Sequence, residues 1–285
     1  MKILLSGSSG GFGSELLTHL RDFEADTISL RYGKLEPKLA SKLSDCDVFI
    51  HCGGSLSSDF ADSFNSNVLL TKELLDFFTL KNSNVHFIYF STMSLLLKKQ
   101  SIMSYDYANF RDMTCYALSK YISEIICSRY KINTTVVRFS TLFYKNPTRD
   151  GLSKIIYDGV RNKKITIYNN GEAKRDFLPL DVASQYVVKL IGKESLFGKT
   201  FNIVSGRETT FREIADFLKS KISDLTIKNE NLDIADNVPT NFDCTDVRSI
   251  GEIDFRLFNK LEDYIQELKP LSAHPLNDTR KEFRC

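Results

Sequence analysis

The segment Lys2–Gly13, which reads KILLSGSSGGFG, determines how the rest of the chain is interpreted. Its apolar residues 3–5 are typical of a short β-strand that is buried on both faces. Glycines follow at every third position, and residues 14–20 then carry leucines at helical spacing. A flexible loop could share this composition, but its position directly after a buried strand favours a nucleotide-binding βαβ unit. In such a unit the glycines let a pyrophosphate approach the backbone, and the helix N-terminus supplies N–H groups and partial positive charge.

Length and composition limit the possible functions. The chain has 285 residues, enough for one large domain or two smaller ones, and a net charge of +2. No basic stripe is interleaved with aromatic residues, so we expect no nucleic-acid partner. The six cysteines form no C-x-x-C pair and the four histidines do not cluster with them, which argues against a metal site and favours reduced thiols in the cytoplasm. No signal peptide is visible and no apolar run reaches the roughly 18 residues of a membrane helix, so no membrane association is expected.

The end of the second predicted strand bears on the choice of cofactor. Residues 26–30 predict this strand, which is followed by Arg31, and no acidic residue occurs before Glu36. In dinucleotide-binding folds this tip lies near the adenosine ribose, where an acid favours NAD and an arginine can receive the 2′-phosphate of NADP. We therefore expect NADP(H), with NAD as a possibility. The alternative is that Arg31 belongs to a solvated basic turn.

A third buried strand is predicted over residues 47–52, and Gly53 and Gly54 follow it. Small residues at a strand end let a cofactor lie against the backbone. His51 is a lone histidine at this strand end, and a structural role is more common there than catalysis. An amphipathic helix is expected over residues 65–80.

Hydroxyl groups end the fourth predicted strand, which covers residues 85–90 and runs into Ser91 and Thr92. Such groups face the ligand crevice of an open α/β sheet. Tyr116 and Lys120, at positions i and i+4, share one face of a helix. A nearby ammonium group favours phenolate and would lower the pKa of the tyrosine from ~10 towards the working pH, as acid–base catalysis requires. An ordinary exposed pair is the alternative, but the glycine turn and Thr92 favour catalysis.

Together these motifs resemble the extended short-chain dehydrogenases/reductases, in the branch of nucleotide-sugar epimerases, dehydratases and reductases. The resemblance covers nearly the whole chain. It implies an α/β fold, with a doubly wound parallel Rossmann sheet and a smaller C-terminal substrate-binding domain. The dinucleotide-binding domain is expected over residues 1–142 with a return segment near 175–205, and residues 143–285 are expected to form mainly the substrate-binding domain. The polar residues from Lys269 onward are expected to be a poorly ordered tail.

The same resemblance assigns site residues. The catalytic set is Thr92, Tyr116 and Lys120. The cofactor contacts fall on the glycine turn, the strand tips and the following helices, namely Gly7, Ser9, Gly10, Gly11, Phe12, Gly13, Arg31, Cys52, Gly53, Gly54, Asn67, Tyr116 and Lys120. The substrate contacts are Thr92, Met93, Ser94, Tyr116 and Arg175. No metal ligand is expected.

Arg175 begins a segment similar to the family's R-D-F-x-x-V-x-D-V-A, whose arginine commonly meets the diphosphate of the sugar nucleotide. A guanidinium suits a bidentate phosphate contact, although a surface salt bridge to Asp176 or Asp181 is the alternative. The family also implies a homodimer, in which the helix that contains Tyr121 and Glu124 pairs with its mate.

The prediction of the reaction type rests on few residues. Sugar 4,6-dehydratases of this family carry Thr-Asp-Glu at the catalytic strand end, whereas this chain has Thr92-Met93-Ser94, which argues against a dehydratase. Because reductases consume NADPH, Arg31 favours reduction of a nucleotide-linked 4-keto-6-deoxy sugar, a precursor of surface polysaccharide. The alternative is an NAD(P)-dependent nucleotide-sugar 4-epimerase. A second alternative is a non-catalytic nucleotide sensor on the same fold, against which the complete catalytic set argues.

Overall fold

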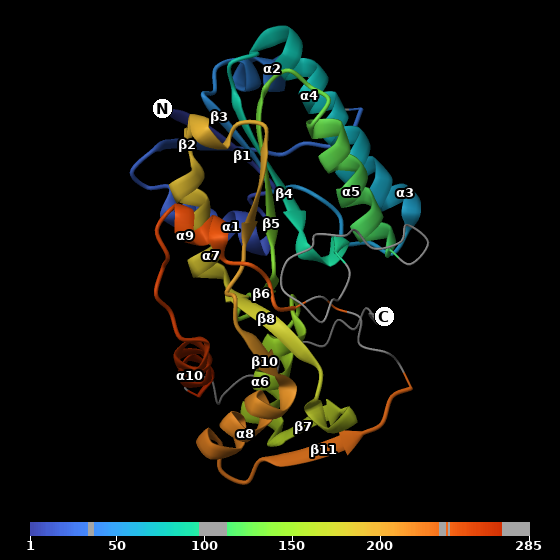
Figure 1. The fold of residues 1–285 in the computed structure, drawn as a ribbon, viewed down its shortest axis with the longest axis vertical. Coiled ribbons are helices and arrows are strands. Elements are labelled where there is room, and N and C mark those ends of the chain that lie inside the picture. Colours follow the sequence, from blue (N-terminus) through green and yellow to red (C-terminus); the bar gives the residue numbers. More distant parts are fainter. Residues whose placement is uncertain (34–36, 97–112, 234–237, 239, 270–285) are drawn as a thin grey trace.

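The computed structural model describes residues 1–33, 37–96, 113–233, 238 and 240–269. The predicted tail beyond Lys269 therefore lies outside the described residues. The larger part of the molecule contains the main sheet, and the smaller part lies beyond the carboxyl ends of its strands (Figure 1). Across the described part of the chain, no helix combines the length and the apolarity needed to cross a bilayer.

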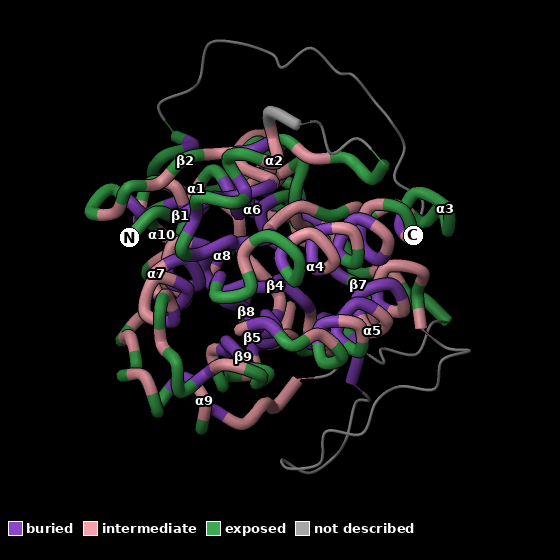
Figure 2. Tube along the Cα trace, turned by 90° about the horizontal axis from the view of Figure 1, so that it is seen from above, coloured by how far each residue is buried: buried purple, intermediate pink, exposed green. Residues whose placement is uncertain are grey.

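A parallel sheet forms the centre of the larger part. Within the described residues it has six strands in the order β2-β1-β3-β4-β5-β9. Their bounds are Lys2–Ser6 for β1, Glu24–Ile28 for β2, Val48–His51 for β3, His86–Thr92 for β4, Asn133–Phe139 for β5 and Lys199–Ile203 for β9. The central strands are buried on both faces, which explains their continuous apolar sequence (Figure 2).

Helices cover both faces of this sheet (Figure 1). On one face α1 (Gly11–His19) packs beside α7 (Leu180–Leu190). On the other face lie α2 (Pro37–Ser44), α4 (Leu70–Lys81) and α5 (Cys115–Cys127). The short α3 (Phe60–Ser63) and the π-helix η1 (Phe64–Leu69) lead into α4, and the 3-10 turn η2 (Met93–Leu95) follows β4. This arrangement is the predicted doubly wound Rossmann fold.

The smaller part has its own core. Within the described residues it contains a three-stranded sheet in the order β10-β8-β6 and a pair formed by β11 and β7. The strands are β6 (Thr141–Phe143), β7 (Lys164–Tyr168), β8 (Lys174–Pro179), β10 (Glu208–Thr210) and β11 (Thr226–Glu230). The helices are α6 (Gly151–Asn162), α8 (Phe211–Lys221) and α10 (Leu257–Leu268), with the 3-10 turn η3 (Asn169–Gly171) beside them. Their apolar faces form one cluster around Ile156, Ile214 and Leu261.

The chain returns to the larger part more than once. α7 and β9 complete the Rossmann layers, with the 3-10 turn η4 (Glu194–Leu196) between them. The short α9 (Thr245–Ser249) also lies against β9, where Asp246 Oδ2 accepts a hydrogen bond of 2.7 Å from Asn202 N. Residues 245–249 therefore pack on the Rossmann part, although they belong to the segment expected to form mainly the substrate-binding domain.

Candidate functional site

The glycine turn brings the end of β1 against the end of β3. Gly7 has a φ of +77°, and a Cβ atom on it would lie 2.6 Å from Gly53 N. A Cβ atom on Gly13 would lie 2.3 Å from Gly7 O. Since no side chain fits at either position, the turn depends on glycine for its shape and for its close approach to β3.

The N-terminus of α1 provides backbone donors. Its first helical bond runs from Ser14 N to Gly10 O over 3.0 Å, so the N–H groups of Gly11, Phe12 and Gly13 precede the i→i−4 ladder. The Phe12 side chain is buried between the rings of the core, so only its backbone faces the turn. These donors and the open glycine surface fit a dinucleotide pyrophosphate.

The end of β3 meets the candidate catalytic lysine. A Cβ atom on Gly54 would lie 2.6 Å from Asn67 Oδ1 and 3.2 Å from Lys120 Nζ. Glycine at this position is therefore required for both side chains to reach the strand end. Cys52 also lies within electrostatic reach of the Lys120 ammonium group.

Asn67, a predicted cofactor contact, makes several hydrogen bonds within the chain. It is fully buried in η1, its Oδ1 accepts from Ser55 N over 2.8 Å, and its Nδ2 donates to Ser55 O and to Ser119 Oγ over 2.9 and 2.8 Å. In this structure the amide therefore ties the loop after β3 to α5. The amide also lies beside Gly54, where a Cβ atom would be 2.6 Å from Asn67 Oδ1.

Thr92, Tyr116 and Lys120 come together at the carboxyl edge of the sheet. Thr114 caps α5 through a 3.1 Å bond from Ala117 N, which places Tyr116 in the first turn. The Tyr116 hydroxyl is hydrogen-bonded to Thr92. Lys120 Nζ donates to Phe90 O over 2.8 Å and lies 5.9 Å from the centre of the Tyr116 ring. The sequence pattern therefore identified residues that meet in space.

The pKa values of this pair differ from the expectation. Burial raises the pKa of Tyr116 to about 12, and the hydrogen bond with Thr92 opposes this rise. Burial lowers the pKa of Lys120 from 10.5 to about 8, although the charges of Cys52 and of other neighbours favour its ammonium form. Desolvation thus outweighs the expected lowering of the tyrosine pKa, because both groups lie in a poorly hydrated site. At neutral pH the pair consists of a protonated phenol and an ammonium ion.

The remaining residues that were predicted to contact cofactor or substrate differ in their exposure and in their contacts. Ser94 is exposed, and its hydroxyl lies 3.0 Å from Thr92 Oγ1. The Met93 side chain is buried in the core, so a substrate contact there would have to come from its backbone. Arg31 is exposed beyond the end of β2, and Ser9 is exposed in the glycine turn. Arg175 donates to Lys174 O over 2.5 Å and lies over the Phe211 ring.

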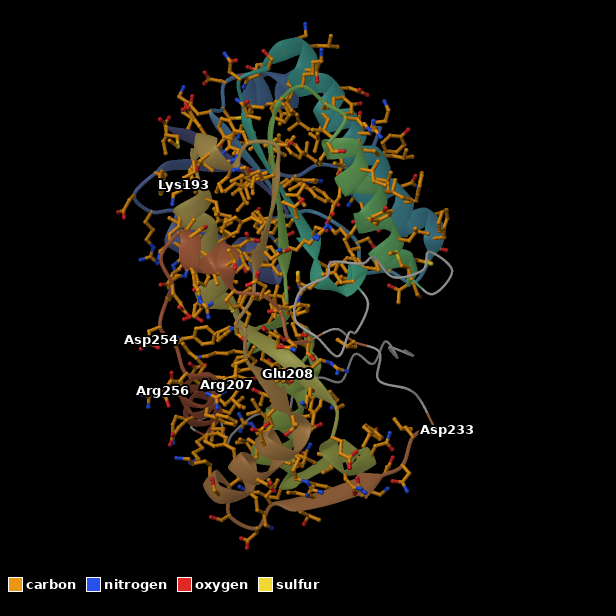
Figure 3. The ribbon with its side chains drawn as sticks, viewed as in Figure 1. Lys193, Arg207, Glu208, Asp233, Asp254 and Arg256 are labelled. Atoms are coloured by element: carbon orange, nitrogen blue, oxygen red, sulfur yellow. The ribbon has the colours of Figure 1, made fainter. Side chains whose placement is uncertain are left out.

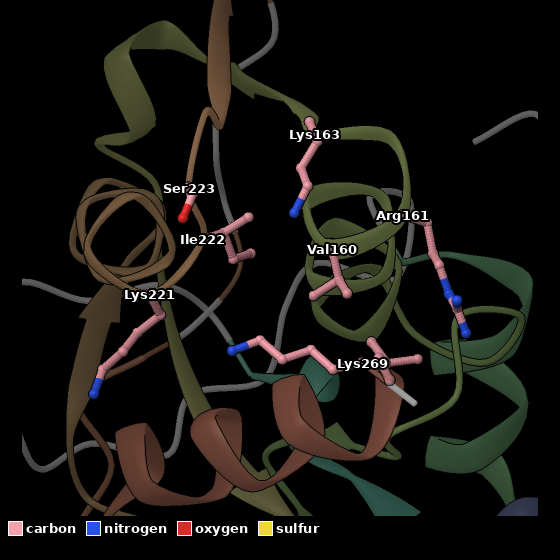
Figure 4. A pocket seen from close by; sticks show the side chains of 8 residues that line it. Val160, Arg161, Lys163, Lys221, Ile222, Ser223 and Lys269 are labelled. Atoms are coloured by element: carbon pink, nitrogen blue, oxygen red, sulfur yellow. The ribbon is translucent and has the colours of Figure 1, made fainter. Parts of the chain in front are cut away.

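Two hollows lie in the smaller part. One, of about 350 Å³, lies beside the loop before α10, near the Arg207 and Asp254 side chains labelled in Figure 3. The other, of about 410 Å³, is lined by Val160, Arg161, Lys163, Lys221, Ile222, Ser223, Leu268 and Lys269 (Figure 4). Its cations stand at the C-terminal ends of α6, α8 and α10, where the helix dipole favours positive charge. Their placement needs no ligand, and we assign none.

Comparisons with known proteins agree with this geometry. The model of the NAD dependent epimerase/dehydratase family matches residues 3–203. A curated protein of Bacillus subtilis (strain 168), named as an uncharacterized UDP-glucose epimerase, is 24% identical over 278 residues, which cover 84% of this chain and 86% of that protein. The chain belongs to the NAD-dependent epimerase/dehydratase family and is an enzyme of the extended short-chain dehydrogenase/reductase type.

Solved structures share the whole fold. A UDP-glucuronic acid 4-epimerase from Bacillus cereus, in complex with UDP-glucuronic acid and NAD, matches with a TM-score of 0.77 and 22% identity, over 94% of this chain and 100% of that chain. The protein RMD from Pseudomonas aeruginosa, complexed with NADPH, matches with a TM-score of 0.78 and 18% identity, over 94% of this chain and 99% of that chain. These similarities confirm the predicted fold class.

Proposed function

We propose that this enzyme is a nucleotide-sugar 4-epimerase that keeps its nicotinamide dinucleotide bound through each turnover. The observation that carries the proposal is the set of Thr92, Tyr116 and Lys120 beside the glycine turn, in which Thr92 is the hydrogen-bonding neighbour of Tyr116 and Lys120 Nζ lies 5.9 Å from the Tyr116 ring. The choice of epimerisation over reduction is supported by the similar proteins, several of which are named as 4-epimerases or as a UDP-glucose epimerase. The reductase prediction depended on Arg31 alone and is the less supported of the two.

The chain's own groups account for cofactor placement and proton transfer. The N–H groups at the start of α1 would hold the pyrophosphate, and Gly53 and Gly54 would leave room beside β3. The cofactor, when bound, supplies a reversible hydride acceptor. Tyr116 has to be the phenolate when it acts as the base, and the Lys120 charge would stabilise that form against the effect of burial. The phenolate would then take the proton of the sugar 4-hydroxyl and later return it, while Thr92 orients the phenol oxygen.

The end of β4 argues against elimination of water. Of the two residues that follow β4, Ser94 is exposed and Met93 is buried. Neither side chain can act as the carboxyl acid or base that a 4,6-dehydratase needs. We therefore propose that oxidation at C4 is followed by return of the hydride, without loss of a leaving group.

The nucleotide sugar would lie between the carboxyl edge of the main sheet and the smaller part. We propose that Arg175 on β8 contacts its diphosphate, since a guanidinium can bind two phosphate oxygens at once. Similar proteins are described with UDP-glucose or UDP-glucuronic acid. A UDP-hexose is accordingly the first substrate class to test.

We also propose a homodimer that uses the outer face of α4 and α5. Leu80 and Ile125 are exposed apolar side chains on these helices, at 80% and 40% of their full surface. Glu124, by contrast, is only 7% exposed and points into the core, so it is not part of this face. Leu80→Glu with Ile125→Glu should shift the mass measured by light scattering towards the monomer, whereas Lys228→Glu, at an exposed position on β11, should leave it unchanged.

The reaction can be tested directly. The enzyme is incubated with UDP-, dTDP-, GDP- and CDP-linked sugars, both keto and non-keto, with and without added NAD or NADP. Interconversion of two non-keto sugars, seen by anion-exchange chromatography without net change in reduced nicotinamide absorbance, is the expected result. Stoichiometric loss of that absorbance with a 4-keto sugar would instead support the prediction of a reductase. Absence of turnover with the whole panel, combined with cofactor binding, would favour the non-catalytic sensor.

A further inference from the structure

Tyr144 is fixed at the junction between the two parts of the molecule. It follows β6 directly, and its backbone N–H donates to Asp150 Oδ2 over 3.0 Å. The same carboxylate begins α6, because Asp150 Oδ1 accepts from Ser153 N over 2.7 Å and Oδ2 accepts from Ser153 Oγ over 2.6 Å. The first turn of α6, in the smaller part, therefore determines where the Tyr144 backbone lies.

The Tyr144 ring lies on the glycine turn. A Cβ atom on Gly11 would be 2.8 Å from Tyr144 Cδ1 and 3.0 Å from Cε1. Gly11 is the first residue of α1 and contributes one of the N–H groups expected to meet the pyrophosphate. The space that a side chain at Gly11 would fill is thus taken by a ring from the other part of the molecule.

The hydroxyl end of Tyr144 extends towards the catalytic residues. Tyr116, Asp150, Arg149 and Cys52 are all within electrostatic reach of the phenol. The side chain thus touches the start of α1 and lies within electrostatic reach of Tyr116, and a dinucleotide has to pass between these two places from its pyrophosphate to its nicotinamide. Burial raises the pKa of Tyr144, so the phenol is protonated at neutral pH and can donate a hydrogen bond.

We propose that Tyr144 is a cofactor-binding residue, which covers the dinucleotide at Gly11 and donates a hydrogen bond to it from the side of the smaller part. The residue would slow the loss of cofactor between the two hydride transfers. This role in retaining the cofactor rests on the proposed epimerase function. The contact between Tyr144 and the cofactor does not depend on which reaction the enzyme catalyses.

Cofactor binding without sugar tests the contact. Titration calorimetry with NAD and NADP would compare the unmutated enzyme with Tyr144→Phe, Tyr144→Ala and the control Tyr168→Ala, which removes an exposed tyrosine of β7. We expect Tyr144→Ala to weaken binding of the preferred dinucleotide by about tenfold, Tyr144→Phe to weaken it less, and the control to leave it unchanged. Unchanged or tighter binding by a folded Tyr144→Ala variant would overturn the proposal, since the ring would then be irrelevant or would obstruct the site.

Gly11→Ala provides a second, independent measurement. Alanine is a better helix former than glycine, so this change should not destabilise α1 itself. It should displace the ring and weaken cofactor binding in the unmutated background, and its effect should be clearly smaller in the Tyr144→Ala background. Equal effects of Gly11→Ala in the two backgrounds would refute the contact. Because these are binding measurements, they stand whether or not the sugar panel shows epimerisation.

Discussion

Glu124 and Arg138 form a buried two-point ion pair, one helical turn beyond Lys120 on α5. Arg138 Nη2 lies 2.6 Å from Glu124 Oε2, and Arg138 Nε lies 2.9 Å from Glu124 Oε1. Ser91 Oγ donates to the same Oε1 over 2.5 Å. A single carboxylate thereby joins β4, β5 and α5 directly beneath the catalytic residues. Ser91 precedes Thr92 in the chain, so this network holds two members of the catalytic set in place.

Removing the charge of Glu124 should destabilise the fold. Glu124→Gln removes the carboxylate charge that pairs with the buried Arg138 guanidinium, and we expect a loss of about 3–5 kcal/mol in the free energy of unfolding measured with urea. Asp45→Asn is the matched control, because the Asp45 pair with Lys2 is exposed. That control should change stability by no more than about 1 kcal/mol.

Stability and positioning can be separated with a double variant. Replacing Glu124 by Leu together with Arg138 by Met removes both charges, and stability should largely return. If the network positions Thr92 and Lys120, turnover should remain low while the urea midpoint recovers. Recovery of turnover together with stability would show that the pair has only a structural role.

Tyr116→Phe tests proton transfer. The ring and its packing remain, but the hydroxyl that is bonded to Thr92 is lost. Turnover on the true substrate should fall by ~10² or more, and the dissociation constant for the cofactor should stay near that of the unmutated enzyme. Tyr130→Phe removes a hydroxyl that donates to Asp76, away from the site, and serves as the control. Full activity of the Tyr116 variant would exclude this residue as the acid–base group.

The sequence was sufficient to predict the layers of the fold and to select three residues that meet in the structure, Thr92, Tyr116 and Lys120. Both predictions rest on local patterns. Buried parallel strands are continuous apolar runs, and the i, i+4 spacing fixes Tyr116 and Lys120 on one helix face. The second strand was displaced in the prediction, which placed it at residues 26–30, whereas β2 covers Glu24–Ile28. This strand is at the sheet edge and mostly polar, so apolar periodicity could not locate it.

Contacts between distant segments could not be derived from the sequence. Asn67 matches a family motif, but its amide is occupied by Ser55 and Ser119. The position of Tyr144 on Gly11 depends on how the two parts of the molecule meet. The pKa of Tyr116 depends on the hydration of the site, which spacing along a helix does not reveal. From the sequence, the glycines of this turn indicate only that a group such as a pyrophosphate approaches the backbone closely.

Lys120 should impose a pH dependence on stability. Its folded pKa is lowered from 10.5 to about 8, so the unfolded state binds more protons between these values. The contribution of this group to stability is therefore unfavourable below pH 8 and becomes less so as the pH rises towards 10.5. Lys120→Met should raise the melting temperature at pH 7 and abolish turnover, and its stabilising effect should shrink above pH 8. A stabilising effect that is independent of pH would contradict this assignment.

Cofactor choice depends on the turn after β2. Arg31 is exposed there, and two residues later Gly33 N donates to Glu73 Oε2 over 2.9 Å, so a cation and a carboxylate both lie near the predicted ribose site. If Arg31 receives the 2′-phosphate, the unmutated enzyme should bind NADP more tightly than NAD, and Arg31→Asp should reverse the order in calorimetry. Arg21→Asp makes the same charge change at an exposed position after α1 and should have little effect on the order. Tighter binding of NAD by the unmutated enzyme would show that Arg31 is merely solvated. Glu73→Gln would then test whether that carboxylate selects the unphosphorylated ribose.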